Sequence, residues 1–379
     1  MKFSTKAKAL VVAGFIAVSS ATPAHAVDLQ GSGASFVDPL LQACKAGFAK
    51  ASSHSYVYTS TGSGTGKKNS DSKIGDFWFS DSAHTATTKR STVFHAPIIA
   101  APIAVLVNLP AKKELFLSPT TVAKIFSGEI TKWNDPAIIA DNNREIKTTV
   151  YRKDKNGNAA KDKNGNPIVL RSGTKSVIYT LPNQPITVIY RSDRSGTSGN
   201  FTAWLRGVAP TTWTKPQNDT FVTAFPGNIN APGNIGRIVG ASSSTGVSQL
   251  AAKTKYSITY AEVSYGTKYN LKATALGNAS GNFALPTGDA TAAFLGSATV
   301  DAKGIFKFDY ATKEAGAYTL GIITYMLGDS DYKDKAAVPA IKQWANLIIS
   351  PACTDLAPDF IAITGPLKRY ADAAIAKLG

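Results

Sequence analysis

The sequence predicts an α/β protein whose mainly parallel sheets are divided between two lobes. Strand-like and helix-like segments alternate along the chain, as they do in parallel sheets that are covered by helices. The continuous apolar run APIIAAPIAVLVN at 96–108 is typical of a strand that is buried on both faces. The chain has 379 residues, more than one hydrophobic core usually holds, so a second lobe is expected.

The first predicted helix lies in the stretch SPTTVAKIFSGEITKW at 118–133. Thr120 or Thr121 is expected to cap its first turn, and Gly128 is expected to end it. Its inward face is predicted from three apolar residues at helical spacing, Val122, Ile125 and Phe126.

The later elements are predicted from the same periodicities. PITVIY at 185–190 indicates a second buried strand, and NFTAWLRG at 200–207 indicates a helix with its apolar residues on one face. Two closing helices are expected, in AAVPAIKQWANLII at 336–349 and in GPLKRYADAAIAKL at 365–378.

Residues 1–26 have the three-part layout of a secretory signal peptide. Lysines come first, an apolar core runs from Ala9 to about Val18, and the sequence AHA forms a cleavage site. The alternative is a permanent N-terminal anchor, but the apolar core is about half as long as a membrane span. No cysteine follows the small residues, so we expect no lipid anchor and an exported, extracytoplasmic or periplasmic chain.

The chain is strongly basic, with 41 Lys and Arg residues, 25 Asp and Glu residues and a net charge of +16. Without the three lysines of residues 1–26 the net charge is +13. Such a field attracts anions in general, including small oxyanions, nucleic acid, cell-wall polymers and lipid head groups. No block dense in Lys or Arg is interleaved with aromatic residues, which argues against a nucleic-acid surface. We therefore interpret the charge as spread over a solvated surface.

Cys44 and Cys353 are the only cysteines of the chain. Export places them in an oxidising compartment, so one disulfide between the two ends of the chain is expected, with two separate buried thiols as the alternative. No metal site is expected, because two cysteines and the histidines of the mature chain have no ligand-like spacing. The chain also lacks the G-x-S-x-G motif of a serine hydrolase.

The hexapeptide KDKNGN occurs twice, at 153–158 and at 161–166. Asn-Gly is a strong turn signal, so the repeat predicts two exposed turns in an inserted hairpin at about 151–176. A calcium loop is the alternative reading, since Asp and Asn alternate from Asp154 onward. However, Ala159 stands where such a loop needs glycine, and Gly165 stands where it needs glutamate.

The stretch YRSDRSGTSGNFTAWL at 190–205 predicts an anion-binding turn. A strand ends at Tyr190 and a helix begins near Ser198, and ligands of α/β sheets bind beyond such strand ends, beside helix N-termini. Ser195 and Thr197 add hydroxyl donors, and the guanidinium of Arg191 matches a tetrahedral oxyanion. The alternative, an ordinary helix cap beside a surface arginine, stays open at this point.

Two further stretches, GSGASF at 31–36 and YTSTGSGTGKK at 58–68, are also rich in glycine and hydroxyls. The second is not a nucleotide-binding P-loop, because Thr61 replaces the first required glycine and Lys68 replaces the magnesium-binding Ser or Thr. The stretch DFWFSDS ends an apolar run on Asp81. A carboxylate accepts a hydrogen bond from protonated phosphate and repels fully ionised sulfate, so Asp81 is expected to select for phosphate.

These motifs together resemble the extracytoplasmic phosphate-binding protein of ABC phosphate importers, the substrate-binding component. The resemblance covers most of the mature chain, and its seven motifs keep the order of the family. They are GSGASFVDPLL, YTSTGSGTG, DFWFSDS, PIIAAPIAVLVNLP, VAKIFSGEITKWNDPAI, ITVIYRSDRSGTSGNFTAWL and SITYAEVSY.

The resemblance implies a two-lobed fold of the periplasmic-binding-protein type, with phosphate held in the cleft between lobes joined by crossing segments. The implied first lobe comprises 27–104 and 287–379, and the implied second lobe 105–286. Asp193 is implied to pair with Arg191 behind the ligand. The implied phosphate ligands are Ser35, Phe36, Ser63 and Asp81 from the first lobe, and Arg191, Ser195, Gly196 and Thr197 from the second.

The implied function is high-affinity phosphate binding and delivery to a permease of two transmembrane subunits and an ATPase, by a monomer without a cofactor. The alternatives are a phosphatase-like enzyme, a binding protein for another protonated oxyanion such as arsenate, and an adhesion or signalling module. The chain departs from the family pattern at Val37, where proline is usual, at GASSSTGV in 240–247, and in the extra hairpin. Ser35 replaces the commoner threonine and keeps its hydroxyl.

Overall fold

The computed structural model describes residues 26–110, 114–154, 160–165 and 167–379. The predicted signal peptide therefore lies outside the described residues, apart from Ala26. None of the helices in the described part of the chain combines the length and the apolar character that crossing a membrane requires.

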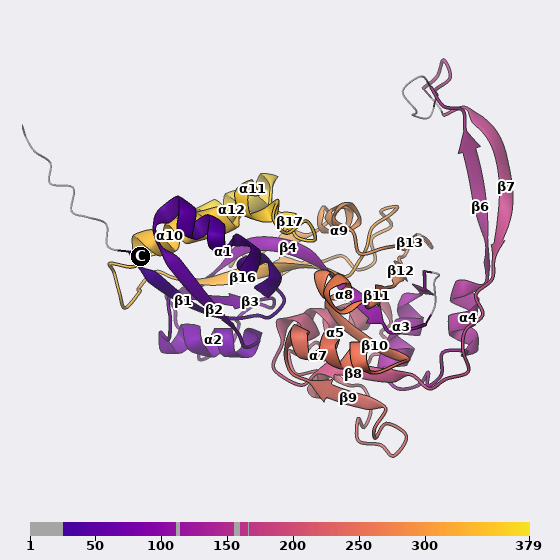
Figure 1. Ribbon diagram of the computed structural model, residues 1–379, viewed down its shortest axis with the longest axis horizontal. Helices are drawn as coiled ribbons and strands as arrows, with labels where there is room; N and C mark the ends of the chain where they lie inside the picture. The colour runs from indigo at the N-terminus through magenta and orange to yellow at the C-terminus, as the bar shows by residue number, and fades with distance from the viewer. Residues whose placement is uncertain (1–25, 111–113, 155–159, 166) are drawn as a thin grey trace, which may run out of the picture.

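The core of the fold is one path of eight paired strands, in the order β2-β1-β3-β16-β4-β10-β8-β9 (Figure 1). Two short strands, β11 and β17, also pair with β4. The strands are β1 (Asp28–Gly33), β2 (Ser55–Ser60), β3 (Phe77–Ser80), β4 (Val93–Val107), β8 (Thr187–Arg191), β9 (Ile238–Ala241), β10 (Ser257–Glu262), β11 (Lys272–Ala273), β16 (Gly321–Asp329) and β17 (Ile361–Ala362).

The sheet divides into two lobes along β4, which confirms the expected two-lobed α/β class. β4 pairs with β16 as far as Pro102 and with β10 from Ile103 onward. The outer pairs of both lobes are parallel, as the sequence predicts. The central pairs are antiparallel, because β4 leads the chain into the second lobe and β16 leads it back. We call the β1, β2, β3 and β16 side the first lobe and the β8, β9 and β10 side the second lobe.

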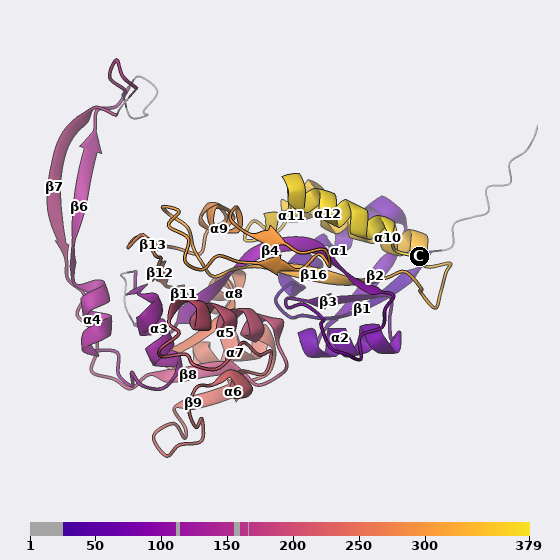
Figure 2. The same cartoon turned by 180° about the vertical axis from the view of Figure 1, so that it is seen from behind.

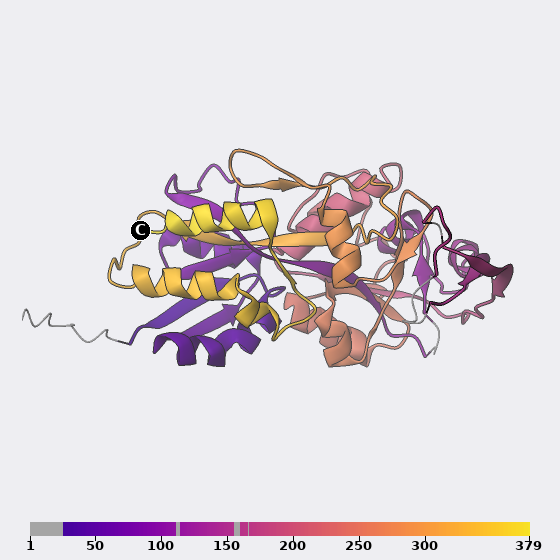
Figure 3. The ribbon, with the colours of Figure 1, turned by 90° about the horizontal axis from the view of Figure 1, so that it is seen from above.

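Helices cover both lobes, and the first lobe combines the two ends of the chain, indigo and yellow in Figure 3. Its helices are α1 (Asp38–Ser52), α2 (Ser63–Ser72), α10 (Val338–Ile348), α11 (Pro351–Thr354) and α12 (Gly365–Ala376). The others are α3 (Pro119–Phe126), α4 (Pro136–Asn142), α5 (Gly196–Val208), α6 (Phe221–Ala224), α7 (Ser243–Lys253), α8 (Ser264–Tyr269) and α9 (Gly288–Leu295). The remaining strands are β5 (Phe116–Leu117), β6 (Arg144–Tyr151), β7 (Val169–Val177), β12 (Ala275–Gly277), β13 (Phe283–Ala284), β14 (Thr299–Val300) and β15 (Phe306–Lys307).

The predicted helix at 118–133 is present as α3, but its expected cap is wrong. Ser118, rather than Thr120 or Thr121, is the N-cap, and its hydroxyl accepts a hydrogen bond from the amide of Thr121 at 3.3 Å. Pro119 occupies the first helical position, so the cap has to precede it. The three apolar residues expected to face inward are buried.

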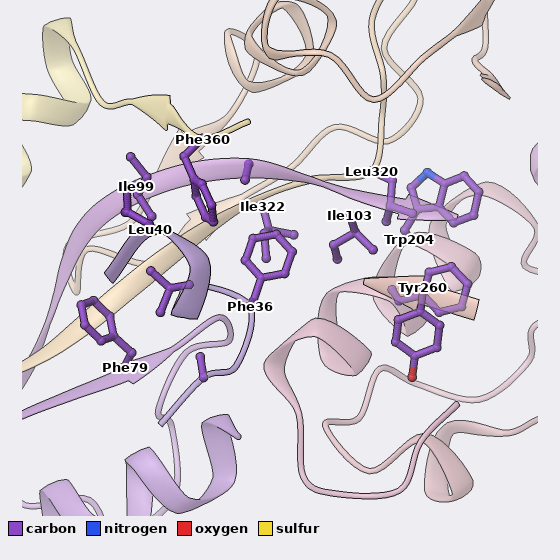
Figure 4. Packing of buried hydrophobic residues seen from close by; sticks show 14 of the residues in the cluster. Phe36, Leu40, Phe79, Ile99, Ile103, Trp204, Tyr260, Leu320, Ile322 and Phe360 are labelled. Carbon is purple, nitrogen blue, oxygen red and sulfur yellow. The ribbon is translucent and has the colours of Figure 1, made fainter. Parts of the chain in front are cut away.

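Apolar side chains along β4 and β16 connect the two lobes. Figure 4 shows them from Phe79 in the first lobe, through Ile322 and Ile103, to Trp204 and Tyr260 in the second. All belong to one cluster of buried residues. Because this cluster follows the crossing strands, a movement of one lobe against the other has to bend β4 and β16 rather than separate two independent cores.

A disulfide joins Cys44 of α1 to Cys353 of α11, which confirms the expected pairing. The bond closes a loop with a sequence separation of 309 residues. Native disulfides of exported domains typically contribute about 2–5 kcal/mol to the free energy of unfolding. The bond therefore holds the two chain ends together in the first lobe.

The predicted hairpin is present and longer than expected. β6 and β7 pair from Arg144 opposite Val177, so the ladder begins seven residues before the predicted start at 151. In the second copy of the repeat, the amide of Gly165 donates to the carbonyl of Asp162 at 3.0 Å, which confirms a turn there. The first copy extends beyond residue 154 and lies largely outside the described residues.

Candidate functional site

The candidate site lies where the carboxyl ends of parallel strands from both lobes meet. α1 follows β1, α2 follows β2, α5 follows β8 and α7 follows β9, each after a short connection. Asp81 directly follows β3. Parallel strands place their carboxyl ends at one edge of a sheet, where ligands of α/β proteins bind. Every predicted ligand residue belongs to one of these strand ends, to the connection after it or to the first turn of the helix that follows.

The first-lobe residues are buried at this edge. Ser63 is the first residue of α2, and its hydroxyl accepts a hydrogen bond from the amide of Asp81 at 3.2 Å. The carbonyl of Ser35 accepts a hydrogen bond from the hydroxyl of Tyr265 in the second lobe at 2.8 Å. Phe36 is fully buried and packs edge-on against Phe360, with ring centroids 6.4 Å apart.

The second-lobe residues form the first turn of α5 and the strand end before it. α5 begins at Gly196, two residues before the predicted start, because Ser195 is the N-cap and accepts from the amide of Ser198. Arg191 is the last residue of β8 and is only 1 % exposed. Arg191 is therefore not a surface arginine, although Ser195 is the ordinary helix cap that the alternative expected.

Direct hydrogen bonds bring the two halves of the predicted set together. The hydroxyl of Thr197 donates to Oδ2 of Asp81 at 3.2 Å, and the amide of Gly64 donates to the carbonyl of Arg194 at 2.9 Å. A Cβ at Gly196 would lie 2.8 Å from the hydroxyl oxygen of Ser63. Only glycine therefore allows this close approach of α5 to the first lobe.

Arg191 is held by an ion pair with Asp193 and by a hydrogen bond to Ser244 of α7. Its Nε and one terminal nitrogen donate to the two carboxylate oxygens of Asp193 at 2.7 and 2.6 Å. Its other terminal nitrogen donates to the hydroxyl of Ser244 at 3.2 Å. Burial alone would raise the pKa of Asp193, but the hydrogen bonds and the charge of Arg191 outweigh burial and lower that pKa below its ordinary value. The guanidinium is thus fixed in orientation and partly neutralised.

Asp81 is a buried carboxyl whose pKa is raised to about 6. Burial is the dominant cause, and hydrogen bonds from Thr324 and Thr197 and the charge of Arg191 oppose it. The hydroxyl of Thr324 donates to Oδ1 at 2.9 Å, opposite the bond from Thr197 to Oδ2. At neutral pH Asp81 is therefore mostly an ionised acceptor, and it becomes a donor in mildly acidic solution.

Ser244 and Thr324 are site residues that the sequence analysis did not identify. The amide of Ser244 donates to the hydroxyl of Ser35 across the lobes at 2.9 Å. Its stretch, GASSSTGV, has the same serine-rich strand-to-helix pattern as the connection before α5 and could have been found by that pattern. Thr324 had no such signal, because it lies 243 residues from Asp81 within an apolar strand.

A second polar bridge joins the lobes at the rim of the site. Lys67 of α2 donates to Oδ2 of Asp219 in the second lobe at 2.8 Å, and Ser82 donates to the same oxygen at 2.9 Å. The two side chains of the ion pair are 11 % and 13 % exposed. The carbonyl of Asp219 also accepts from the amide of Ser195 at 2.9 Å. We call Lys67, Ser82 and Asp219 the rim bridge.

Across the described ranges, no three His, Cys, Asp or Glu side chains lie close enough to hold a metal ion. His84 instead pairs with Asp71 at 2.8 Å, and the ring of His95 accepts a hydrogen bond from the amide of His84 at 2.8 Å.

Two α/β lobes, crossing strands between them, and polar strand ends meeting at their junction define the class of two-lobed ligand-binding proteins. Residues 19–352 match the model of the PBP superfamily domain. The chain belongs to the PBP superfamily.

Named relatives agree with this assignment. The chain is 29% identical over 332 residues to the phosphate-binding protein PstS 3 of Mycobacterium tuberculosis, which covers 84% of this chain and 77% of the relative. It is 27% identical over 325 residues to the phosphate-binding protein PstS of Xylella fastidiosa, with 84% and 76% covered. The fold is similar to that of PfluDING, a high affinity periplasmic phosphate-binding protein bound with phosphate, with a TM-score of 0.65, 20% identity and 91% and 93% covered.

Proposed function

We propose that the protein binds inorganic phosphate outside the cytoplasm and delivers it to an ABC-type permease. The relatives named above are phosphate-binding proteins, and the superfamily match covers most of the chain. The observation that carries the proposal is that a buried guanidinium, Arg191, and a buried carboxyl, Asp81, interact electrostatically among hydroxyls from both lobes. Arg191 supplies positive charge for an oxyanion, and the carboxylate of Asp81 accepts a hydrogen bond from a protonated oxygen of that oxyanion.

The proposed ligand set divides between the lobes, whose boundaries we place at 27–104 with 287–379 and at 105–286. Asp193 pairs with Arg191 and moderates its charge. Ser244, at the N-terminus of α7, accepts a hydrogen bond from Arg191 and supports its position in the site. The ligands are the hydroxyls of Ser35, Ser63, Ser195 and Thr197, the amides of Phe36 and Gly196, the guanidinium of Arg191 and the carboxylate of Asp81.

Closure around a dehydrated ion follows from this division. Each lobe holds part of the donor set, so phosphate that contacts both lobes favours the closed form over the open form. Burial of the site strengthens each charged hydrogen bond, because water no longer competes for the donors. The closed form then presents the surface that a permease of two transmembrane subunits and an ATPase recognises. The protein acts as a monomer in this scheme.

The direct test is binding of phosphate by the purified protein after extensive dialysis. We expect phosphate to be released on denaturation of the undialysed protein, and tight phosphate binding with little sulfate binding in titration calorimetry. Arsenate, which is also partly protonated at neutral pH, is expected to bind. The same preparation should not hydrolyse a phosphate ester. Equal binding of phosphate and sulfate, or turnover of the ester, would contradict the proposal.

The rim bridge predicts a specific effect on closure. Lys67→Met removes the ion pair with Asp219 but keeps the apolar stem, so the closed form loses an interaction between lobes. We expect phosphate to bind about fivefold more weakly, in line with roughly 1 kcal/mol for a partly buried ion pair. The change should appear mainly as faster dissociation in stopped-flow measurements.

Lys68→Met is the matched control for this prediction. Lys68 is the next residue along α2 and is exposed, so its loss changes the net charge equally without touching the bridge. Equal dissociation rates for the two variants would show that the bridge does not stabilise closure.

A further inference from the structure

The hairpin of β6 and β7 extends away from both lobes. Figures 1 and 2 show it rising from the end of α4, with its tip far from the body of the molecule. Its ladder joins β6 only to β7, in a sheet of two strands. The described side chains at 152–154, 161–165 and 169–174 are exposed. The hairpin therefore contributes little to the core and presents a long surface to the surroundings.

The hairpin carries a larger share of the positive charge than its length alone would give. Residues 144–178 contain nine Lys and Arg residues and three Asp and Glu residues, so they carry +6 of the total of +16. This segment is about a tenth of the chain. The charge is therefore spread unevenly over the surface, and the hairpin is complementary to a polyanionic surface.

Exposed apolar side chains at a β-bulge lie beside the basic residues of the hairpin. Val150 pairs with Arg171 and Tyr151 pairs with Val169, so Leu170 between them is an extra, bulged residue. Leu170 is 64% exposed and Val169 is 52% exposed. Exposed apolar side chains beside exposed basic ones are typical of surfaces that enter the boundary between lipid head groups and acyl chains. A dissolved polyanion would make use of the charges alone.

We propose that this hairpin docks on a membrane surface that carries anionic phospholipid head groups. The basic side chains bind the head-group phosphates, and Leu170 with Val169 enters the interface between them. The inference goes beyond phosphate binding, because it concerns a surface that shares no residue with the phosphate site. Docking by the hairpin would hold the exported protein near the membrane without a lipid anchor.

The test is co-sedimentation of the full mature chain with lipid vesicles. We expect binding to phosphatidylcholine vesicles that contain phosphatidylglycerol, little binding to phosphatidylcholine alone, and loss of binding at high salt. Binding to neither kind of vesicle would overturn the proposal, and so would equal binding to both. Capture by nucleic acid or heparin without vesicle binding would assign the hairpin to a dissolved polyanion and would also overturn it.

Variants separate the hairpin from the general charge of the molecule. The triple variant Lys153→Glu, Lys161→Glu, Lys163→Glu is expected to lose at least about tenfold in vesicle binding. Leu170→Ser is expected to lose several-fold without a change of charge, and an unchanged value would contradict insertion. The matched control changes three exposed lysines on the second lobe by the same total charge, as Lys215→Glu, Lys253→Glu, Lys255→Glu.

Phosphate titration of each variant keeps the test independent of the phosphate site. All these variants are expected to bind phosphate like the unchanged protein, which also shows that they fold. Equal loss of vesicle binding in the hairpin triple and in the control triple would overturn the proposal.

Discussion

Arg191→Ala is expected to weaken phosphate binding by at least about 1.5–3 kcal/mol, the range for one hydrogen bond to a charged group. Arg191 is the only fully buried basic side chain among the described residues. Two of its three guanidinium nitrogens donate hydrogen bonds to Asp193, which fixes the orientation of the group. Its loss removes the main positive charge of the site and leaves Asp193 without its ion-pair partner. Titration calorimetry would measure the change directly.

Two further variants keep this result interpretable. Arg191→Lys retains the charge but not the planar fork, so we expect an intermediate affinity. Arg194→Ala removes an exposed arginine three residues away and should leave the affinity nearly unchanged. Thermal unfolding of each variant separates loss of binding from loss of fold. If Arg191→Ala and Arg194→Ala bound phosphate equally well, Arg191 would not be a ligand.

Asp81→Asn is expected to narrow the preference for phosphate over sulfate by at least about tenfold. The carboxylate accepts a hydrogen bond from the hydroxyl that protonated phosphate carries and sulfate lacks, and an unpaired charged group at a buried site is costly. The amide of asparagine removes the negative charge that repels sulfate. Competition titrations with both anions measure the ratio of the phosphate affinity to the sulfate affinity. An unchanged ratio would show that Asp81 does not determine the selectivity.

The pKa of Asp81 also predicts how anion binding depends on pH. Because burial raises this pKa to about 6, the carboxylate is ionised above that value and protonated below it. Sulfate binding is therefore expected to increase in the unchanged protein between about pH 8 and about pH 5, and to change little in Asp81→Asn. By the same linkage, the stability contributed by protonated Asp81 is greatest in acid and is lost as pH rises through 6.

Asp76→Asn is the control at a partly buried carboxyl elsewhere in the first lobe. Burial also raises the pKa of Asp76, but its carboxylate accepts from the amide of Gln30 and lies outside the site. This variant should leave both the anion preference and its pH dependence unchanged.

Local sequence patterns predicted most of the scaffold. The apolar run at 96–108 became β4, and the closing helices became α10 and α12 within a few residues. Where a local prediction failed, the cause was also local, as in the displacement of the α3 cap by Pro119. These features depend on periodicity and on neighbouring residues, so they can be deduced from a short window of sequence.

The amino-acid sequence by itself determined the residue types of the site, the turns that carry them and the charge that favours an anion. Only the tertiary structure decided which of those residues meet, because their contacts span distances that no local pattern encodes. The partners of Asp81 at Thr197 and Thr324 are 116 and 243 residues away, and Lys67 lies 152 residues from Asp219. The crossing of β4 and β16 brings these segments together, since it places the strand ends of both lobes at one junction.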